Sequence, residues 1–262
     1  QAPPGPAMTA LADWFSLKDR VVVVTGASSG LGASFAATFA EAGADLVLAA
    51  RRVDRLDDTA ASVRAHGQRA LAVATDVSAP EQCDAVVARA VDEFGRVDVL
   101  VNNAGIAHAV PATRETPEQF RSVVDVNLNG SYWMAQACGR VMRPGSSIIN
   151  ISSVLAVTTA GLPQAAYSAS KAALSGLTRD LASQWGRRKG IRVNALAPGF
   201  FASEMTDAYS EEYVQTTLMP RLLVDRVGHP MELAAAAVWL AAPASGFTTG
   251  QTIVVDGGMS VT

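Results

Sequence analysis

The sequence has little cysteine and no long uninterrupted apolar run. Only Cys83 and Cys138 occur among its 262 residues, and neither belongs to a Cys-x-x-Cys pair. This scarcity argues against a disulfide framework and against a zinc site, so we expect no bound metal. No apolar run reaches the ~18 residues that a membrane-spanning helix needs. Two unreactive thiols and no membrane span lead us to expect a cytoplasmic protein.

Charge is also sparse. Charged residues make up 17% of the chain, the formal net charge is -3, and no long run carries one sign. This balance argues against nucleic acid and against an anionic membrane as partners. The densest basic cluster, residues 187–189, is typical of a solvated helix end, where cations complement the helix dipole. Hydrophobic residues make up 49% of the chain, enough for a large buried core.

Short apolar runs alternate with amphipathic helical patterns along the chain. The runs are residues 21–24, 46–48, 70–73, 97–101, 147–151, 191–196 and 252–255. Several are apolar almost throughout, as in strands covered on both faces. The alternation predicts an α/β fold, a single doubly wound Rossmann-type domain with a parallel seven-stranded sheet flanked by helices on both faces.

We expect one domain over residues 8–262, because no linker or internal repeat divides the chain. Residues 1–7 are rich in Pro, Gly and Ala, and we expect a disordered tail or a remnant of expression there. Residues 200–227 break the alternation, with Met, Tyr and Leu but no strand pattern. A stretch of this length without a strand is usually functional, so we expect an insertion that serves as a substrate lid.

A glycine-rich turn follows the first predicted strand. Residues 25–32 read TGASSGLG, and a helical pattern begins at once. Glycines at this junction allow a sharp turn and let a pyrophosphate approach the N–H groups of the helix start. The spacing differs from the general G-x-G-x-x-G, and a tight turn with close helix packing would also explain it. Its place at the first strand–helix junction favours a nucleotide site.

Two later strand ends carry polar residues. Asp76, followed by Val77, could accept a hydrogen bond from an adenine amino group, or it could cap the next helix. Residues 102–105, NNAG, suit a backbone that passes close to a ribose, or a plain turn. Both alternatives stay open at each position.

The second strand ends without an acid. Ala50 is followed by Arg51 and Arg52, whereas a cofactor with a free ribose 2′-hydroxyl usually meets Asp or Glu there. Arginine matches a 2′-phosphate in charge and geometry. The sequence therefore predicts a preference for NADP(H), with NAD(H) as the alternative cofactor.

Tyr167 and Lys171 are four residues apart in a helical pattern, so they share one helix face. Free tyrosine, with a pKa of ~10, is a poor acid–base group at neutral pH, and a nearby ammonium would lower that pKa. The pair could then exchange a proton with a carbonyl or hydroxyl oxygen. Upstream, Ser152 and Ser153 follow a strand, and either hydroxyl could donate to the same oxygen.

Asn127 interrupts another helical pattern, where an amide is a mediocre helix former. It could break the helix locally and hold a water near Lys171, or it could cap a kink. These motifs, in this order, resemble those of the short-chain dehydrogenase/reductase family in its compact form of about 250 residues. The resemblance covers the chain from about Leu17 onward.

The resemblance implies a role for each motif residue. Tyr167 would be the acid–base, Ser153 would orient the substrate oxygen, and Asn127 would support a proton-relay water. Lys171 would bind ribose hydroxyls and lower the tyrosine pKa. Ser153 precedes Tyr167 by 14 residues, one more than is usual in the family, so Ser152 stays an alternative.

The cofactor contacts follow from the motifs and the resemblance together. They are Gly26, Ser28, Ser29, Gly30, Leu31, Arg51, Asp76, Val77, Asn103, Ala104, Gly105, Tyr167, Lys171, Pro198, Gly199 and Ser203. The last of these stands where the family commonly has Thr. For the substrate pocket we predict Val154, Leu155, His108, Leu162, Phe200 and the lid around Tyr209 and Met219.

The predicted function is an NADP(H)-dependent oxidoreductase that transfers a hydride between nicotinamide and a ketone or secondary alcohol carbon. One alternative resembles the 3-oxoacyl carrier-protein reductases, with Lys189 and its neighbouring arginines holding an acidic carrier. Others are a sugar-acid dehydrogenase and a non-catalytic dinucleotide-binding sensor. The resemblance also implies a homotetramer, assembled through helices equivalent to residues 119–142 and 166–184 and the C-terminal strand.

Overall fold

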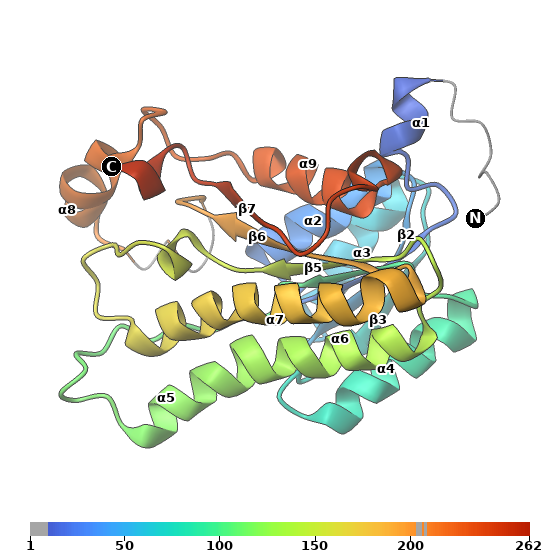
Figure 1. The fold of residues 1–262 in the computed structure, drawn as a ribbon, viewed down its shortest axis with the longest axis horizontal. Coiled ribbons are helices and arrows are strands. Elements are labelled where there is room, and N and C mark those ends of the chain that lie inside the picture. The colour runs from blue at the N-terminus through green and yellow to red at the C-terminus, as the bar shows by residue number, and fades with distance from the viewer. Residues whose placement is uncertain (1–9, 203–205, 207–208) are drawn as a thin grey trace.

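The computed structural model describes residues 10–202, 206 and 209–262. Its sheet has seven parallel strands in the order β3-β2-β1-β4-β5-β6-β7 (Figure 1). They are β1 (Val21–Thr25), β2 (Asp45–Ala50), β3 (Ala70–Ala74), β4 (Val99–Asn102), β5 (Ser147–Ile151), β6 (Arg192–Pro198) and β7 (Thr252–Val255). The order reverses between β1 and β4, the point where open α/β sheets bind ligands at the carboxyl ends of their strands. The predicted fold class is confirmed.

Helices cover both faces of the sheet (Figure 1). One face carries α2 (Gly30–Glu41), α3 (Leu56–Ala65) and α9 (Pro230–Ala241). The other carries α4 (Pro80–Phe94), α6 (Gly130–Val141) and α7 (Ala165–Lys189), with α5 (Pro117–Val124) leading into α6. Shorter helices are α1 (Leu11–Phe15) and α8 (Glu211–Tyr213). Of the described helices, none is long and apolar enough to span a membrane.

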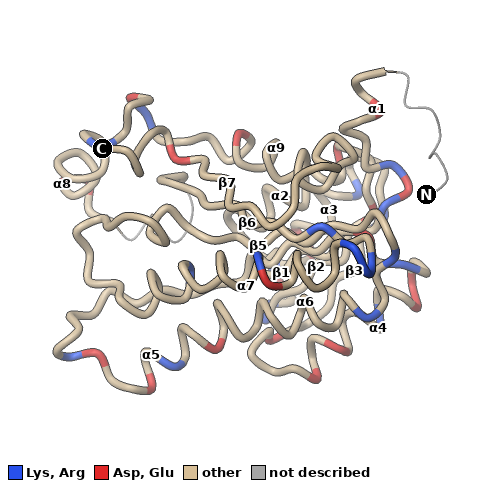
Figure 2. Tube along the Cα trace, viewed as in Figure 1, with Lys and Arg blue, Asp and Glu red and all other residues tan. Residues whose placement is uncertain are grey.

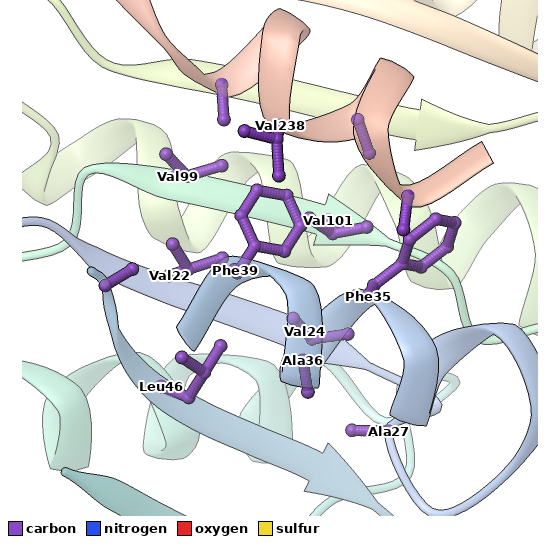
Figure 3. Packing of buried hydrophobic residues seen from close by; sticks show 14 of the residues in the cluster. Val22, Val24, Ala27, Phe35, Ala36, Phe39, Leu46, Val99, Val101 and Val238 are labelled. Carbon is purple, nitrogen blue, oxygen red and sulfur yellow. The ribbon is translucent and has the colours of Figure 1, made fainter. Parts of the chain in front are cut away.

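The packing of α2 on the sheet fixes the start of the glycine-rich turn. Phe35 and Phe39 of α2 are fully buried against Val22 and Val24 of β1, and Val238 of α9 lies over Phe39 (Figure 3). Each such side chain contributes about 1.5–3 kcal/mol of burial free energy. The N-terminus of α2 is thereby held over the carboxyl end of β1.

Buried amides connect the central strands to α6 and α7. The Asn102 side chain in β4 donates to the Asn150 amide oxygen (2.9 Å) and to the Ser131 carbonyl (2.9 Å). Asn150 in β5 donates in turn to the Thr178 hydroxyl on α7 (2.9 Å). Because broken buried hydrogen bonds are costly, this chain of bonds fixes α7 relative to the strand ends.

Candidate active site

A cavity of about 370 Å³ opens at the carboxyl ends of the strands. Every predicted cofactor residue that the structure describes lines it, from Gly26 at one end to Tyr167 and Lys171 near the other. Ser203 lies outside the described residues. Parallel strands end at the same edge, so motifs far apart in the sequence meet here. Ser153 also lines the cavity, whereas Asn127 does not.

The glycine-rich turn needs its glycines for two different reasons. Gly26 has φ +64° and Gly30 has φ +52°, a backbone region that favours glycine. A Cβ on Gly32 would lie 2.1 Å from the Gly26 carbonyl oxygen, so α2 packs directly on the turn. The Asn103 side chain donates to the carbonyls of Thr25 (2.9 Å) and Gly26 (3.2 Å), which holds the turn in place. No side chain caps the start of α2, which leaves its first N–H groups to an anion.

Arginines and one carboxylate stand at this end of the cavity. Arg51 is exposed and lines it, and the Arg52 guanidinium donates to the Ser29 hydroxyl (3.3 Å). Asp76 accepts hydrogen bonds from the hydroxyl (2.7 Å) and backbone N–H (3.0 Å) of Ser78. The Ser78 hydroxyl is the main cause of a lowered Asp76 pKa. The carboxylate therefore closes a turn before α4 and lines the cavity, but it does not cap α4, whose start at Ala79 has no side-chain cap.

The two serines after β5 have different partners. Ser153 and Tyr167 both line the cavity, and the Ser153 side chain acts to lower the Tyr167 pKa. The Ser152 hydroxyl instead donates to the Lys171 backbone carbonyl (2.8 Å), and its side chain is buried. Both serines line the cavity, but the Ser152 hydroxyl is already bonded to α7, which favours Ser153 as the partner of Tyr167.

Burial dominates the ionisation of the tyrosine–lysine pair. Desolvation raises the pKa of Tyr167 to about 12, against the opposing effect of the Ser153 side chain. Desolvation also lowers the pKa of Lys171 to about 8. The Lys171 Nζ lies 5.7 Å from the centroid of the tyrosine ring and donates to the Ile151 carbonyl (2.7 Å). The expectation that the ammonium lowers the tyrosine pKa is therefore wrong here.

Asn127 lies in a π-helical turn, Asp125–Asn129, between α5 and α6. Its side chain accepts from the Ile106 N–H (2.8 Å) and donates to the Ile106 carbonyl (2.9 Å) and the Ser170 hydroxyl (3.1 Å). The helix is widened where this side chain leaves it, and π-turns are frequent at functional sites. Asn127 thus joins the loop after β4 to α7, behind the cavity wall. Its role in a water relay stays a prediction.

The other end of the cavity has an apolar wall. Val154 and Leu218 belong to an apolar cluster that is separate from the two clusters covering the sheet. The aromatic rings of Phe200 and Tyr209 are stacked at 6.2 Å, and Tyr213 meets Tyr209 edge-on at 5.5 Å. All of these side chains line the cavity.

Two side chains connect this wall to the loop after β5. The Tyr213 hydroxyl donates to the Ala160 carbonyl. Arg221 donates to the Thr158 hydroxyl (2.9 Å), to the Thr159 carbonyl and to the Met259 carbonyl near the C-terminus (3.1 Å). The described part of residues 200–227 is thereby fixed as one side of the cavity. That the whole segment acts as a lid stays a prediction.

The predicted pocket wall was right only in part. Val154, Leu155, Phe200 and Tyr209 line the cavity, but three predicted residues do not: His108, Leu162 and Met219. His108 is exposed, and Leu218 lines the cavity where Met219 was predicted. The prediction missed Ala160, Gln164 and Met259. No local motif marks them, because they meet only after distant segments pack together.

The basic cluster at residues 187–189 is in the last turn of α7. The Lys189 Nζ donates to the Gly139 carbonyl (2.7 Å), and Lys189 is 18 residues beyond Lys171, about 27 Å along the helix. The cluster therefore lies at a helix end, as predicted, and this position gives no support to the alternative in which it holds an acidic carrier. Elsewhere, charges of both signs are interspersed around the outer helices and loops (Figure 2).

Known proteins share both the sequence and this architecture. Residues 26–260 match a family profile described as enoyl-(acyl carrier protein) reductase. Short-chain reductase protein NovJ of Streptomyces niveus is 40% identical over 249 residues, which cover 92% of this chain and 94% of that protein. The chain belongs to the short-chain dehydrogenase/reductase family. The relatives that it matches are named as dehydrogenases and reductases, and this protein is an oxidoreductase.

Two further relatives illustrate the range of the short-chain dehydrogenase/reductases. Gluconate 5-dehydrogenase of Gluconobacter oxydans (strain 621H) is 36% identical, with 95% of this chain and 98% of that protein covered. The solved structure of a short-chain dehydrogenase from Burkholderia cenocepacia J2315, in complex with NADP, has a TM-score of 0.88 and 31% identity. That match covers 93% of this chain and 98% of the other.

Proposed function

We propose that this enzyme is an NADP(H)-dependent oxidoreductase that transfers a hydride between nicotinamide and a ketone or secondary alcohol carbon. The observation that carries the proposal is the pair of Ser153 and Tyr167, which meet at one cavity wall. The pair stands in the wall of a cavity that begins at the glycine-rich turn. A dinucleotide fits the residues present, since the turn is held by Asn103 and the start of α2 has no side-chain cap.

The bound nicotinamide dinucleotide supplies or accepts the hydride. In ketone reduction, Tyr167 donates its proton to the carbonyl oxygen as that oxygen gains negative charge. Its raised pKa keeps the hydroxyl protonated at neutral pH, which suits a proton donor. Ser153 donates a hydrogen bond to the same oxygen and holds it beside Tyr167. In alcohol oxidation the sequence is reversed, and Tyr167 must lose its proton first.

Lys171 has a binding role in this proposal. One N–H of its ammonium is taken by the Ile151 carbonyl (2.7 Å), and a lysine ammonium has three donors. The other two are available for ribose hydroxyls. Because Lys171 lies one helical turn from Tyr167, it would place the dinucleotide next to the proton donor.

Removal of the Tyr167 hydroxyl tests the mechanism. Tyr167→Phe should lower kcat by roughly 100- to 10,000-fold, because the acid–base group is lost. NADPH affinity, measured by fluorescence titration, should change little. Tyr132→Phe removes a hydroxyl from α6, outside the residues lining the cavity, and should keep full activity. If Tyr167→Phe keeps most of its activity on a confirmed substrate, the mechanism is wrong.

Arg51 supports the preference for NADP(H). It lines the cavity beside Asp76, whose pKa its charge helps to lower, and Ala50 leaves no acid to bind a ribose 2′-hydroxyl. Arg51→Asp should reverse the ratio of kcat/KM for NADPH over NADH. Arg121→Asp, the same charge change on exposed α5, should leave the ratio unchanged. A wild-type enzyme that uses NADH as well as NADPH would contradict this preference.

The apolar wall favours a ketone over the alternative substrates. At the substrate end, Lys171 is the one charged side chain among the described lining residues, which leaves little to bind the carboxylate of a sugar acid. The basic cluster that might hold an acyl carrier is at the far end of α7. Ser153, Tyr167 and Lys171 are all at the cavity, which argues against a non-catalytic sensor. Assays with NADPH and a panel of ketones, 3-oxoacyl thioesters and sugar acids distinguish these alternative functions.

We also propose that the enzyme is a homotetramer. The proposal comes from the family resemblance, and exposed apolar side chains on the expected surfaces support it. Phe120 and Val141 are exposed along α5 and α6, and Val254 is exposed on the edge strand β7. Light scattering at micromolar concentration should give four times the mass of the chain. A monomeric mass would refute the proposal.

A further inference from the structure

One buried acceptor in the cavity wall has no partner. The Gln164 side chain is 8% exposed and lines the cavity, and its Oε1 atom makes no hydrogen bond with the described residues. Two other buried side-chain atoms in the described structure are unpaired, Asn102 Oδ1 and Ser146 Oγ, but neither residue lines the cavity. Folded proteins rarely leave a buried acceptor unpaired, so this oxygen requires an explanation.

The backbone around Gln164 is fixed. Its carbonyl accepts from the Ser168 N–H (2.9 Å) in the first turn of α7, and the preceding Pro163 carbonyl accepts from the Val110 N–H (2.9 Å). Gln164 stands immediately before α7 and three residues before Tyr167. The amide therefore extends from the rigid end of the helix that carries the proton donor.

The surroundings of this amide at the substrate end are mostly apolar. Val154, Leu155, Ala160 and Leu218 supply aliphatic surface in the same wall. The side chains of Ser153 and Tyr167 line the same cavity, and both hydroxyls are assigned to the reacting oxygen. A substrate whose body fills the wall would leave Gln164 Oε1 unpaired unless it brought a donor of its own.

We propose that Gln164 Oε1 accepts a hydrogen bond from a hydroxyl group of the substrate. The substrate class is then an apolar ketone that carries a hydroxyl group away from the reacting carbon. This inference rests on the proposed function. A site built around a hydrogen bond discriminates strongly against an analogue without the donor, because the buried acceptor is left unpaired.

The test uses pairs of apolar ketones that differ by one hydroxyl, placed at several positions along the series. The wild-type enzyme should prefer at least one hydroxylated member by about 5- to 100-fold in kcat/KM. Gln164→Met should abolish the preference, mainly through a higher KM for the hydroxylated ketone. Gln164→Glu retains an acceptor and should retain the preference. Gln184→Met, an exposed glutamine on the same helix, is the matched control.

The readout is the ratio of kcat/KM for the two ketones within one variant, so the amount of folded enzyme cancels. An equal loss on both ketones in Gln164→Met would show that Gln164 only supports the fold, and would overturn the inference. A wild-type enzyme without preference for any hydroxylated member would overturn it as well. If the wild type reduces no ketone of the series with NADPH, the proposed function itself fails.

Discussion

Burial of the charged Lys171 should destabilise the folded protein. Replacing this lysine with an apolar residue should therefore raise the free energy of unfolding. Lys171 is 4% exposed, and burial lowers its pKa from 10.5 to about 8. The two pKa values differ by about 2.5, and each pKa unit corresponds to about 1.36 kcal/mol. At pH 7 the protonated lysine therefore destabilises the folded state relative to the unfolded chain by about 3 kcal/mol. Between pH 8 and 10.5 the unfolded chain binds the additional proton. Stability from this group therefore rises with pH across that window, and the cost is fully present below pH 8.

Lys171→Met retains most of the aliphatic chain and removes the charge. The lost hydrogen bond to the Ile151 carbonyl (2.7 Å) should cost about 1 kcal/mol. The net gain at pH 7 is then about 2 kcal/mol, or roughly 4–8 °C in Tm for a chain of this size. At pH 10 the gain should vanish, because the wild-type lysine is neutral in the folded state. The same variant should lose activity and bind NADPH more weakly.

Thermal unfolding followed by circular dichroism at pH 7 and pH 10 measures both effects. Lys18→Met, at an exposed lysine, serves as the control and should change Tm little at either pH. The reasoning is refuted if Lys171→Met lowers Tm at pH 7, or if its effect on Tm is the same at both pH values. Either result would mean that the ammonium is not desolvated in the folded protein.

Three further predictions concern the same cavity. Because the Tyr167 pKa is raised to about 12, the phenolate fraction and the alcohol oxidation rate should rise about tenfold per pH unit, without a plateau below pH 10. A pH–rate profile showing a plateau near pH 8 would contradict this. Gly32→Ala should weaken NADPH binding at least tenfold in a fluorescence titration, since its Cβ would lie 2.1 Å from the Gly26 carbonyl; Gly186→Ala, which meets open space, should not. Asn127→Ala leaves buried partners unpaired and should lower the free energy of unfolding by about 1–3 kcal/mol per group in urea titrations, and kcat with it.

The cofactor end of the cavity could be predicted because its motifs stand at strand ends. Apolar runs located the strands, and parallel strands bring their carboxyl ends to one edge. Residues as distant as Gly26, Asp76 and Pro198 thus line one cavity, although nothing in their spacing says so directly. The strand positions and the order of the motifs were sufficient for this half of the site.

The substrate end could not be predicted in the same way. Its wall depends on how Tyr213 and Arg221 hold one segment against the loop after β5 and the C-terminus, and those contacts have no sequence signature. His108 follows a motif closely yet faces solvent. Spacing also placed an ammonium near Tyr167 but did not reveal that Lys171 is buried and Tyr167 partly buried. The burial decides the direction of both pKa shifts.

The apolar cluster around Val154 and Leu218 is separate from the clusters that cover the sheet. Regions with few contacts to the main core can open at less cost than global unfolding. Exchanges of side chains in this cluster should therefore leave Tyr167 and Lys171, which α7 holds, in place. In the proposed mechanism, the groups that perform the chemistry are held by α7 and the end of β5, whereas this separate cluster contributes to the choice of substrate. New specificities could arise there by a few substitutions, without redesign of the catalyst.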